Sequence, residues 1–176
     1  EFGFGRMIEP SEILNEIRDE LGFSKSGSLM GKRILVTSGP TREPIDPVRY
    51  ISNRSSGIQG KALAEAFLKA GAEVSFVTGP VSSEMPRGAK VIAVETAQEM
   101  FDFVLSDLSY DVAVFAAAVS DWKTKTIYAQ KLKKHKSGDD LELEFVRNPD
   151  ILAEVCRHKY KPRLVIGFAA ETEDME

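Results

Sequence analysis

Asp111-Val-Ala-Val-Phe-Ala-Ala-Ala118 establishes the fold class, because every residue after the first is apolar. An apolar run of this length, without alternating polar residues, predicts a strand that is covered on both faces. Such strands occur in parallel sheets, where helices lie over both sides of the sheet. The flanking sequence should therefore supply more buried strands and the helices that connect them.

Further strands and a connecting helix are predicted around this stretch. Short runs rich in branched residues predict strands at 33–37, 73–78, 90–94 and 163–168. Apolar residues from Ile58 to Ala70 repeat at helical spacing and predict a helix that Gly71 ends. Alternating strands and helices predict an α/β fold, specifically a Rossmann-like three-layer sandwich around a mostly parallel sheet.

Later elements also carry local signals. Thr96-Ala-Gln-Glu99 is a capping box that predicts a helix start. Asn148 followed by Pro149 predicts an N-cap and the first residue of a helix that places Cys156 in the core. The alternation in 141–146 predicts one added antiparallel strand, and the lysine-rich segment before it, 123–140, is interpreted as a flap.

Composition limits the possible function classes. The 176 residues carry 23 Lys and Arg against 27 Asp and Glu, a formal net charge of −4, which argues against a nucleic-acid partner. No apolar run is long enough to cross a membrane as a helix, so no membrane partner is expected. A single cysteine allows no intramolecular disulfide and fits a reducing compartment, so we expect a cytoplasmic protein.

Unusual small and polar residues follow the predicted strands. They occupy 37–41, 78–80, 116–121 and 167–172. Ligands of parallel α/β sheets bind at the carboxyl ends of the strands, so these four segments are expected to form the site.

The common nucleotide fingerprints are both missing. A dinucleotide site would place G-x-G-x-x-G directly after the first strand, where this chain has Ser38-Gly-Pro-Thr-Arg42. The second strand ends in Thr78-Gly79, without the acidic residue that would bind a ribose. The P-loop pattern is also absent from the sequence.

The segment 52–60 precedes the alanine-rich helix and allows two interpretations. Ser55 or Ser56 could cap the helix, with Gly57 and Gly60 allowing close packing of helix on sheet. Alternatively, the free N–H groups and the helix dipole could bind a phosphate. Spacing alone does not distinguish the two.

Charged residues near the predicted carboxyl edge suggest polyphosphate chemistry. Lysines crowd one segment, at positions 123, 125, 131, 133, 134 and 136. They form either a solvated loop or a flap that brings flexible positive charges to a polyphosphate. Asp121 follows the apolar strand and is either a turn residue or a ligand of Mg²⁺ beside phosphates. His135 and His158 lack partners at metal-ligand spacing.

Six stretches in order resemble the phosphopantothenoylcysteine synthetase family, over about residues 30–174. They are Thr37 to Asn53, Ser55-Ser-Gly57, Ala116 to Asp121, Lys131-Leu-Lys-Lys134, Asn148-Pro-Asp-Ile151 and Gly167 to Thr172. Residues 3–10 look like the end of the flavin-dependent decarboxylase that precedes this domain in bacterial fusions, and FMN would belong only to that domain. The resemblance implies that the chain starts with a residual tail of that decarboxylase. The spacing of Ile13, Leu14, Ile17 and Leu21 predicts a short helix, and the small, polar residues 23–31 predict a linker. Residues 1–31 are therefore expected to precede a synthetase domain over 32–176, which we expect to be incomplete at its C-terminus.

The resemblance implies a ligase with two half-reactions. The carboxylate of 4′-phosphopantothenate attacks the α-phosphate of CTP, giving an acyl-cytidylate and pyrophosphate. The amine of cysteine then attacks the acyl carbon and releases CMP. Mg²⁺ would accompany CTP, and the family forms homodimers that complete each other's sites near Arg49 and Asn53.

The resemblance also implies residue roles. Lys131 reaches the triphosphate, and Asp121 lies near the Mg²⁺–phosphate cluster. Asn53 acts on the acyl-cytidylate, with Arg49 nearby. The remaining nucleotide-binding positions are Ser55, Gly57, Ala117, Ala118, Val119 and Phe168. Ser120 and Trp122 depart from the family pattern beside Asp121.

Two other functions stay open on the sequence. One is an NAD(P)-dependent oxidoreductase on the same kind of sheet, against which the missing fingerprints weigh. The other is a non-catalytic nucleotide-binding domain. Within the ligase interpretation, the choice of CTP over ATP rests on the resemblance of residues 3–10 to the bacterial fusion.

Overall fold

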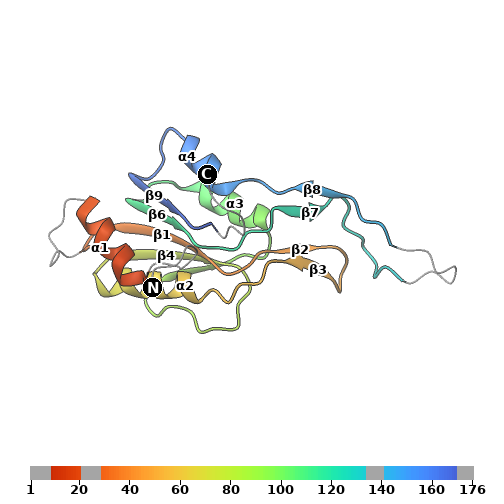
Figure 1. The fold of residues 1–176 in the computed structure, drawn as a ribbon, viewed down its shortest axis with the longest axis horizontal. Helices are drawn as coiled ribbons and strands as arrows, with labels where there is room; N and C mark the ends of the chain where they lie inside the picture. Colours follow the sequence, from red (N-terminus) through yellow and green to blue (C-terminus); the bar gives the residue numbers. More distant parts are fainter. Residues whose placement is uncertain (1–8, 21–28, 134–140, 170–176) are drawn as a thin grey trace, which may run out of the picture.

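The computed structural model describes residues 9–20, 29–133 and 141–169, and a parallel five-stranded sheet forms its centre (Figure 1). Across the sheet, the strands are β5 (Lys90–Ala93), β4 (Glu73–Thr78), β1 (Arg33–Ser38), β6 (Val112–Phe115) and β9 (Leu164–Gly167). Every neighbouring pair is parallel. Counted along the chain within this sheet, the order is 3-2-1-4-5, as in doubly wound folds. The predicted α/β, Rossmann-like class is confirmed.

Helices cover both faces of the sheet, which makes three layers (Figure 1). The helices α1 (Pro10–Glu20) and α2 (Ile58–Lys69) lie on one face, and α3 (Ala97–Ser106) and α4 (Ile151–Arg157) lie on the other. Alternate residues of β1 face opposite cores: Ile34 and Val36 pack with α2, whereas Leu35 packs with α3. None of the described helices is long and apolar enough to cross a membrane.

The N-terminal helix α1 packs against α2. Ile13 and Ile17 are buried in the same core cluster as Phe67 of α2. Leu29, the first described residue after α1, is fully buried, and its N–H donates to the Ala70 carbonyl at 2.7 Å. The domain boundary between residues 31 and 32 stays a prediction.

Two antiparallel ribbons project beyond the carboxyl end of the sheet (Figure 1). One pairs β2 (Arg42–Pro44) with β3 (Tyr50–Ser52), and the other pairs β7 (Trp122–Thr124) with β8 (Phe145–Arg147). The prediction of an added antiparallel strand is confirmed, but that strand begins at Phe145 instead of Leu141. Strands β2, β3 and β7 were not predicted, because three-residue strands leave almost no periodicity in a sequence.

Local side chains cap the starts of α3 and α4. The predicted capping box is present: the Glu99 N–H donates to Thr96 Oγ1 at 3.1 Å, and the Glu99 carboxylate accepts from the Glu95 N–H at 2.7 Å. The prediction that Asn148 caps α4 is wrong, because Asp150 does so by accepting from the Ala153 N–H at 2.9 Å.

Cys156 is exposed, so the prediction of a core cysteine is also wrong. Ile151 and Val155, one helical turn apart, are the buried residues of α4. Cys156 follows Val155 and therefore points about 100° away from that buried stripe.

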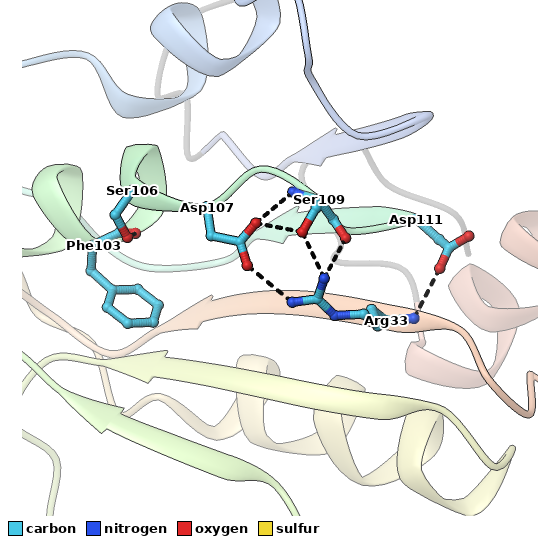
Figure 2. Close-up of polar contacts among 6 residues, drawn as sticks. All are labelled: Arg33, Phe103, Ser106, Asp107, Ser109 and Asp111. Carbon is cyan, nitrogen blue, oxygen red and sulfur yellow. Dashed lines mark hydrogen bonds and ion pairs between the residues drawn. The ribbon is translucent and has the colours of Figure 1, made fainter.

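A polar cluster joins the amino ends of β1 and β6 (Figure 2). The Arg33 guanidinium donates to the Ser109 carbonyl at 2.8 Å and pairs with Asp107 at 3.0 Å. The Arg33 backbone N–H donates to the Asp111 carboxylate at 2.9 Å, and Lys32 pairs with the same carboxylate at 2.9 Å. These contacts hold the central strands in register at the end opposite to the predicted site.

This cluster predicts an acid-sensitive contribution to stability. Hydrogen bonds from the Ser109 side chain and N–H, together with Arg33, lower the pKa of Asp107 from 3.8 to about 2. Because the folded-state pKa is depressed, the contribution is complete above pH 3.8 and is lost as the pH falls towards 2. The Asp107 side chain is 46% exposed, so we expect a small effect.

An NMR titration of the Asp107 carboxyl measures this pKa directly. Ser109→Ala removes the hydroxyl donor and should move the titration midpoint up towards 3.8. A midpoint already at 3.8 in the unmodified chain would contradict the assignment.

Candidate functional site

The order of the central sheet reverses between β1 and β6, and the chain segments that follow these two strands stay paired. Pro40 and Ala118 form a parallel bridge. The Ala118 N–H donates to the Gly39 carbonyl at 2.8 Å, and the Thr41 N–H donates to the Ala118 carbonyl at 3.3 Å. The predicted segment 116–121 therefore lies alongside the segment after β1, at the switch point where doubly wound folds bind ligands.

Close backbone packing explains several glycines here. A Cβ atom on Gly79 would overlap the Pro40 carbonyl oxygen, and one on Gly60 would overlap Ser38 Oγ. Gly60 thus allows α2 to pack on β1, as the packing interpretation expected. Gly39 has a φ of +70°, and Val81 covers the position that its Cβ would occupy.

The start of α2 lacks a side-chain cap. The N-cap is Gly57, with a φ of +72°, so the prediction that Ser55 or Ser56 caps the helix is wrong. The Ser55 and Ser56 hydroxyls accept only long hydrogen bonds of 3.4 Å, from the N–H groups of Gly57 and Ile58 respectively. The first turn contains no acidic residue. The positive end of α2 is therefore electrostatically suited to an anion.

Polar side chains hold the segment after β6. Asn53 Nδ2 donates to the Val119 carbonyl at 3.0 Å, so the structure brings two predicted site residues together. Ser120 is buried, and its N–H donates to Thr41 Oγ1 at 3.0 Å. Asn148 Nδ2 donates to the Ser120 carbonyl at 2.8 Å. Ala117 and Ala118 are half-buried in the same segment.

Asn148 retains an unused acceptor. Its Oδ1 atom is buried and accepts no hydrogen bond from the part of the chain that the structure describes. Such a group usually marks a position where water or a ligand donates.

Arg49 is held by a neighbouring acid that the sequence analysis did not select. Its Nε donates to the Asp46 carboxylate at 3.0 Å, and its Nη2 donates to the Leu132 carbonyl at 2.9 Å. The Arg49 guanidinium and three backbone N–H groups hold the pKa of Asp46 far below its ordinary range. Arg49 and Lys131 are therefore linked through Leu132, although 82 positions separate them in the sequence.

The remaining predicted residues lie at the same end of the sheet. Asp121 is exposed, and its carbonyl accepts from the Asn148 N–H at 2.8 Å. Phe168 follows β9, and its N–H donates to the Phe115 carbonyl at 3.1 Å. Lys131 is exposed, and within the described ranges no hydrogen bond or ion pair joins it to Asp121. Lys134, His135, Lys136 and residues 170–172 lie outside the described residues.

Sequence reasoning assigned no site role to two contributors to this arrangement, Asp46 and Asn148, and it placed Thr41 in the site segment 37–41 without its contact to Ser120. The Asp46-Pro47 pair carries a turn signal, which indicates a local role but gives no hint of contact with Leu132. Asn148 belongs to one of the stretches that carry the resemblance, but its pattern with Pro149 predicts a helix cap and no contact with Ser120. Thr41 carries no sequence signal for its contact with Ser120.

A sequence model described as the DNA/pantothenate metabolism flavoprotein C-terminal domain matches residues 29–176. The chain is 45% identical over 175 residues to the coenzyme A biosynthesis bifunctional protein CoaBC of Vibrio parahaemolyticus. It is 44% identical over 177 residues to that of Bacillus subtilis and 42% identical over 178 residues to that of Escherichia coli. These alignments cover 99% or more of this chain but only 43% of each relative.

Solved structures agree with these matches. A crystal structure of the C-terminal domain of CoaBC superimposes with a TM-score of 0.69 at 41% identity, covering 85% of this chain and 68% of that one. A Cab2 variant in complex with phosphopantothenate-cysteine superimposes with a TM-score of 0.55 at 20% identity, covering 89% of this chain and 67% of that one. At that identity, the second likeness is one of fold alone.

Proposed function

The chain belongs to the DNA/pantothenate metabolism flavoprotein C-terminal domain family, and on that basis we propose that it is a ligase of coenzyme A biosynthesis. It would join 4′-phosphopantothenate to cysteine through an acyl-cytidylate, converting CTP to CMP and pyrophosphate. The curated relatives that support this proposal carry the name of the whole bifunctional protein, of which this chain spans less than half.

One observation carries the proposal: two residues with expected roles contact the segments expected to bind the nucleotide, Asn53 just after β3 and Arg49 at the tip of the β2–β3 ribbon. Asn53 donates to Val119 in the segment expected to border the nucleotide. Arg49 holds the peptide next to Lys131, the residue expected to reach the triphosphate. A nucleotide at this edge of the sheet would thus lie beside Asn53, and Lys131 would have to reach it from the projecting ribbons.

The chemistry requires charge neutralisation and positioning. A triphosphate and an attacking carboxylate repel each other, so cationic groups and helix N–H groups must offset the negative charge. Lys131 supplies a flexible ammonium, and the uncapped start of α2 at Gly57 supplies N–H groups. Asn53 would hold the acyl-cytidylate while the cysteine amine attacks its acyl carbon.

Mg²⁺ fits this site only together with phosphates. Among the described residues, no three or more His, Cys, Asp or Glu side chains form a group that could hold a metal ion. Mg²⁺ usually binds one or two carboxylates, substrate phosphates and water, and it does not need a cage made only of protein. Asp121 would be that carboxylate, and the ion would neutralise the triphosphate.

A second copy of the chain is the proposed partner of the ribbons. Large apolar side chains are exposed on the ribbons and their connections: Val48, Tyr50, Trp122, Ile127, Leu141 and Phe145. A concentration of exposed apolar side chains on one part of a molecule, here the two ribbons, is typical of an interaction surface. A homodimer through this surface would bring the partner close to Arg49 and Asn53.

The oxidoreductase alternative loses support at the end of β1. In dinucleotide-binding folds, a helix starts directly after the first strand and its N-terminus binds the pyrophosphate. Here β1 leads through Gly39 and Pro40 into strand β2. The first crossover helix, α2, starts only after the whole β2–β3 ribbon.

Calorimetric titration with CTP, ATP and NADPH, each with Mg²⁺, tests the proposal. We expect selective binding of CTP. A preference for ATP would retain the ligase chemistry with a different nucleotide. Binding of NADPH alone would overturn the proposal in favour of the oxidoreductase. CTP binding without product formation from 4′-phosphopantothenate and cysteine would favour a non-catalytic nucleotide-binding domain.

The variant Lys131→Gln tests, in the same calorimetric titration, whether the Lys131 ammonium contacts the triphosphate. Losing one charged contact should weaken CTP binding at least about tenfold. Lys90→Gln is the matched control, because it removes the same charge at the first residue of β5, at the amino edge of the sheet. Equal affinities for the two variants would contradict the role of Lys131.

A further inference from the structure

Asp46 is a buried carboxylate at the tip of the β2–β3 ribbon, and its side chain is fully covered. One oxygen, Oδ1, accepts from the N–H groups of Val48 and Arg49, both at 2.9 Å. The other, Oδ2, accepts from Arg49 Nε and Nη2 and from the Leu132 N–H, the last at 3.1 Å. Five donors on one carboxylate explain why burial of the charge is tolerated.

Asp46 and Arg49 both hydrogen-bond to the backbone of one residue in the lysine-rich segment, Leu132. Asp46 accepts from the Leu132 N–H, while Arg49 Nη2 donates to the Leu132 carbonyl at 2.9 Å. Both backbone polar groups of Leu132 are therefore held by a single ion pair, here called the Asp46–Arg49 clamp. Lys131 immediately precedes the clamped residue and is itself exposed.

Further contacts align the same segment along the ribbon. The Thr124 hydroxyl donates to the Pro44 carbonyl at 3.0 Å, and the Tyr128 N–H donates to the Ile45 carbonyl at 2.9 Å. In Figure 1, β7 runs beside β2 in agreement with the first of these contacts. The clamp is the last of three attachment points and the one nearest to Lys131.

We propose that Asp46 is a positioning residue, which acts with Arg49 to fix the backbone at Leu132 and so to present the Lys131 ammonium to the triphosphate. This inference rests on the proposed function. It gives Arg49 a role in nucleotide binding, in addition to the role near the acyl-cytidylate that the resemblance implies. Lysine is flexible, so without a fixed backbone its charge would be spread over a larger volume.

The test is a double-mutant cycle read by CTP affinity in the presence of Mg²⁺. Asp46→Asn preserves the shape but replaces one acceptor oxygen with an amide nitrogen. Misplacing Lys131 should weaken CTP binding about tenfold. In a Lys131→Gln background, Asp46→Asn should change affinity less than about threefold, because the positioned group is already gone.

Glu43→Gln is the matched control. Glu43 is a second buried acid on the same ribbon, and it accepts from the Ala97 N–H at the start of α3 at 2.9 Å instead of contacting Leu132. We expect this variant to keep CTP affinity within about twofold, even if it loosens the ribbon. Arg49→Lys is a second clamp variant that retains the charge but lacks the planar fork, and it should repeat the loss of affinity.

The outcomes separate the two proposals. If the unmodified chain binds no CTP, the proposed function fails and this inference fails with it. If the unmodified chain binds CTP and both clamp variants bind equally well, only the inference is overturned. If Asp46→Asn weakens CTP binding as much in the Lys131→Gln background as in the unmodified chain, the inference is also overturned, because Asp46 would then act on another contact.

Discussion

Asn53→Asp is expected to slow product formation by about 100-fold while leaving the affinity for CTP within about threefold of the unmodified chain. The Asn53 amide donates to the Val119 carbonyl at 3.0 Å, and a carboxylate at that position offers only acceptors. The substitution therefore removes a donor and places a carboxylate oxygen against the Val119 carbonyl oxygen. Product formation from CTP, 4′-phosphopantothenate and cysteine measures turnover, and calorimetry measures affinity.

Asn53→Ala distinguishes loss of the donor from gain of a charge. If the amide donor is what matters, the alanine and aspartate variants should lose similar amounts of turnover. A much larger loss for aspartate would assign the effect to the new negative charge. A parallel loss of CTP affinity in both variants would contradict a role on the acyl-cytidylate and assign Asn53 to nucleotide binding.

Gly79→Ala is expected to destabilise the fold by about 3 kcal/mol or more. The new Cβ would overlap the Pro40 carbonyl oxygen and would lie 2.7 Å from the Pro40 carbonyl carbon. Both obstacles are backbone atoms, so no side-chain rotation can relieve the clash. The segment after β1 would have to move, although it pairs with Ala118. Urea unfolding measures the loss of stability.

Gly31→Ala is the control for backbone strain alone. Gly31 has a φ of +75°, but a Cβ there would meet no heavy atom within 4 Å. Its replacement should cost about 1–2 kcal/mol, the penalty of a left-handed backbone conformation for alanine. If Gly79→Ala unfolded at the same urea concentration as the unmodified chain, the close approach at Pro40 would be contradicted.

The central sheet and the start of α3 could be predicted because their signals are local. Apolar stretches such as 111–118 indicate burial on both faces, and Thr96 with Glu99 satisfies N–H groups within one turn. Where two local explanations competed, tertiary contacts decided. Asn148 donates to Ser120 instead of capping α4, and Gly57 occupies the cap position that the neighbouring serines could have filled.

The candidate site was only partly accessible to such reasoning. Asn53, Arg49 and Lys131 were selected as site residues because the chain resembles a family. That resemblance did not point to the residues that hold them in place. Asp46 would pass for an ordinary turn residue beside Pro47. Its contact with Leu132 spans 86 positions and follows no period of helix or strand.

The sequence by itself determined the α/β class, the buried strands and most helix positions, and it predicted a ligand site at the carboxyl edge of the sheet. Each of these depends on residues within one helical turn or one strand. Only the tertiary structure decided that β2–β3 lies against the lysine-rich segment, and that the Asp46–Arg49 ion pair holds Leu132, the neighbour of Lys131. The physical reason is that a buried carboxylate must find donors wherever the fold brings them, and a linear pattern does not encode that proximity.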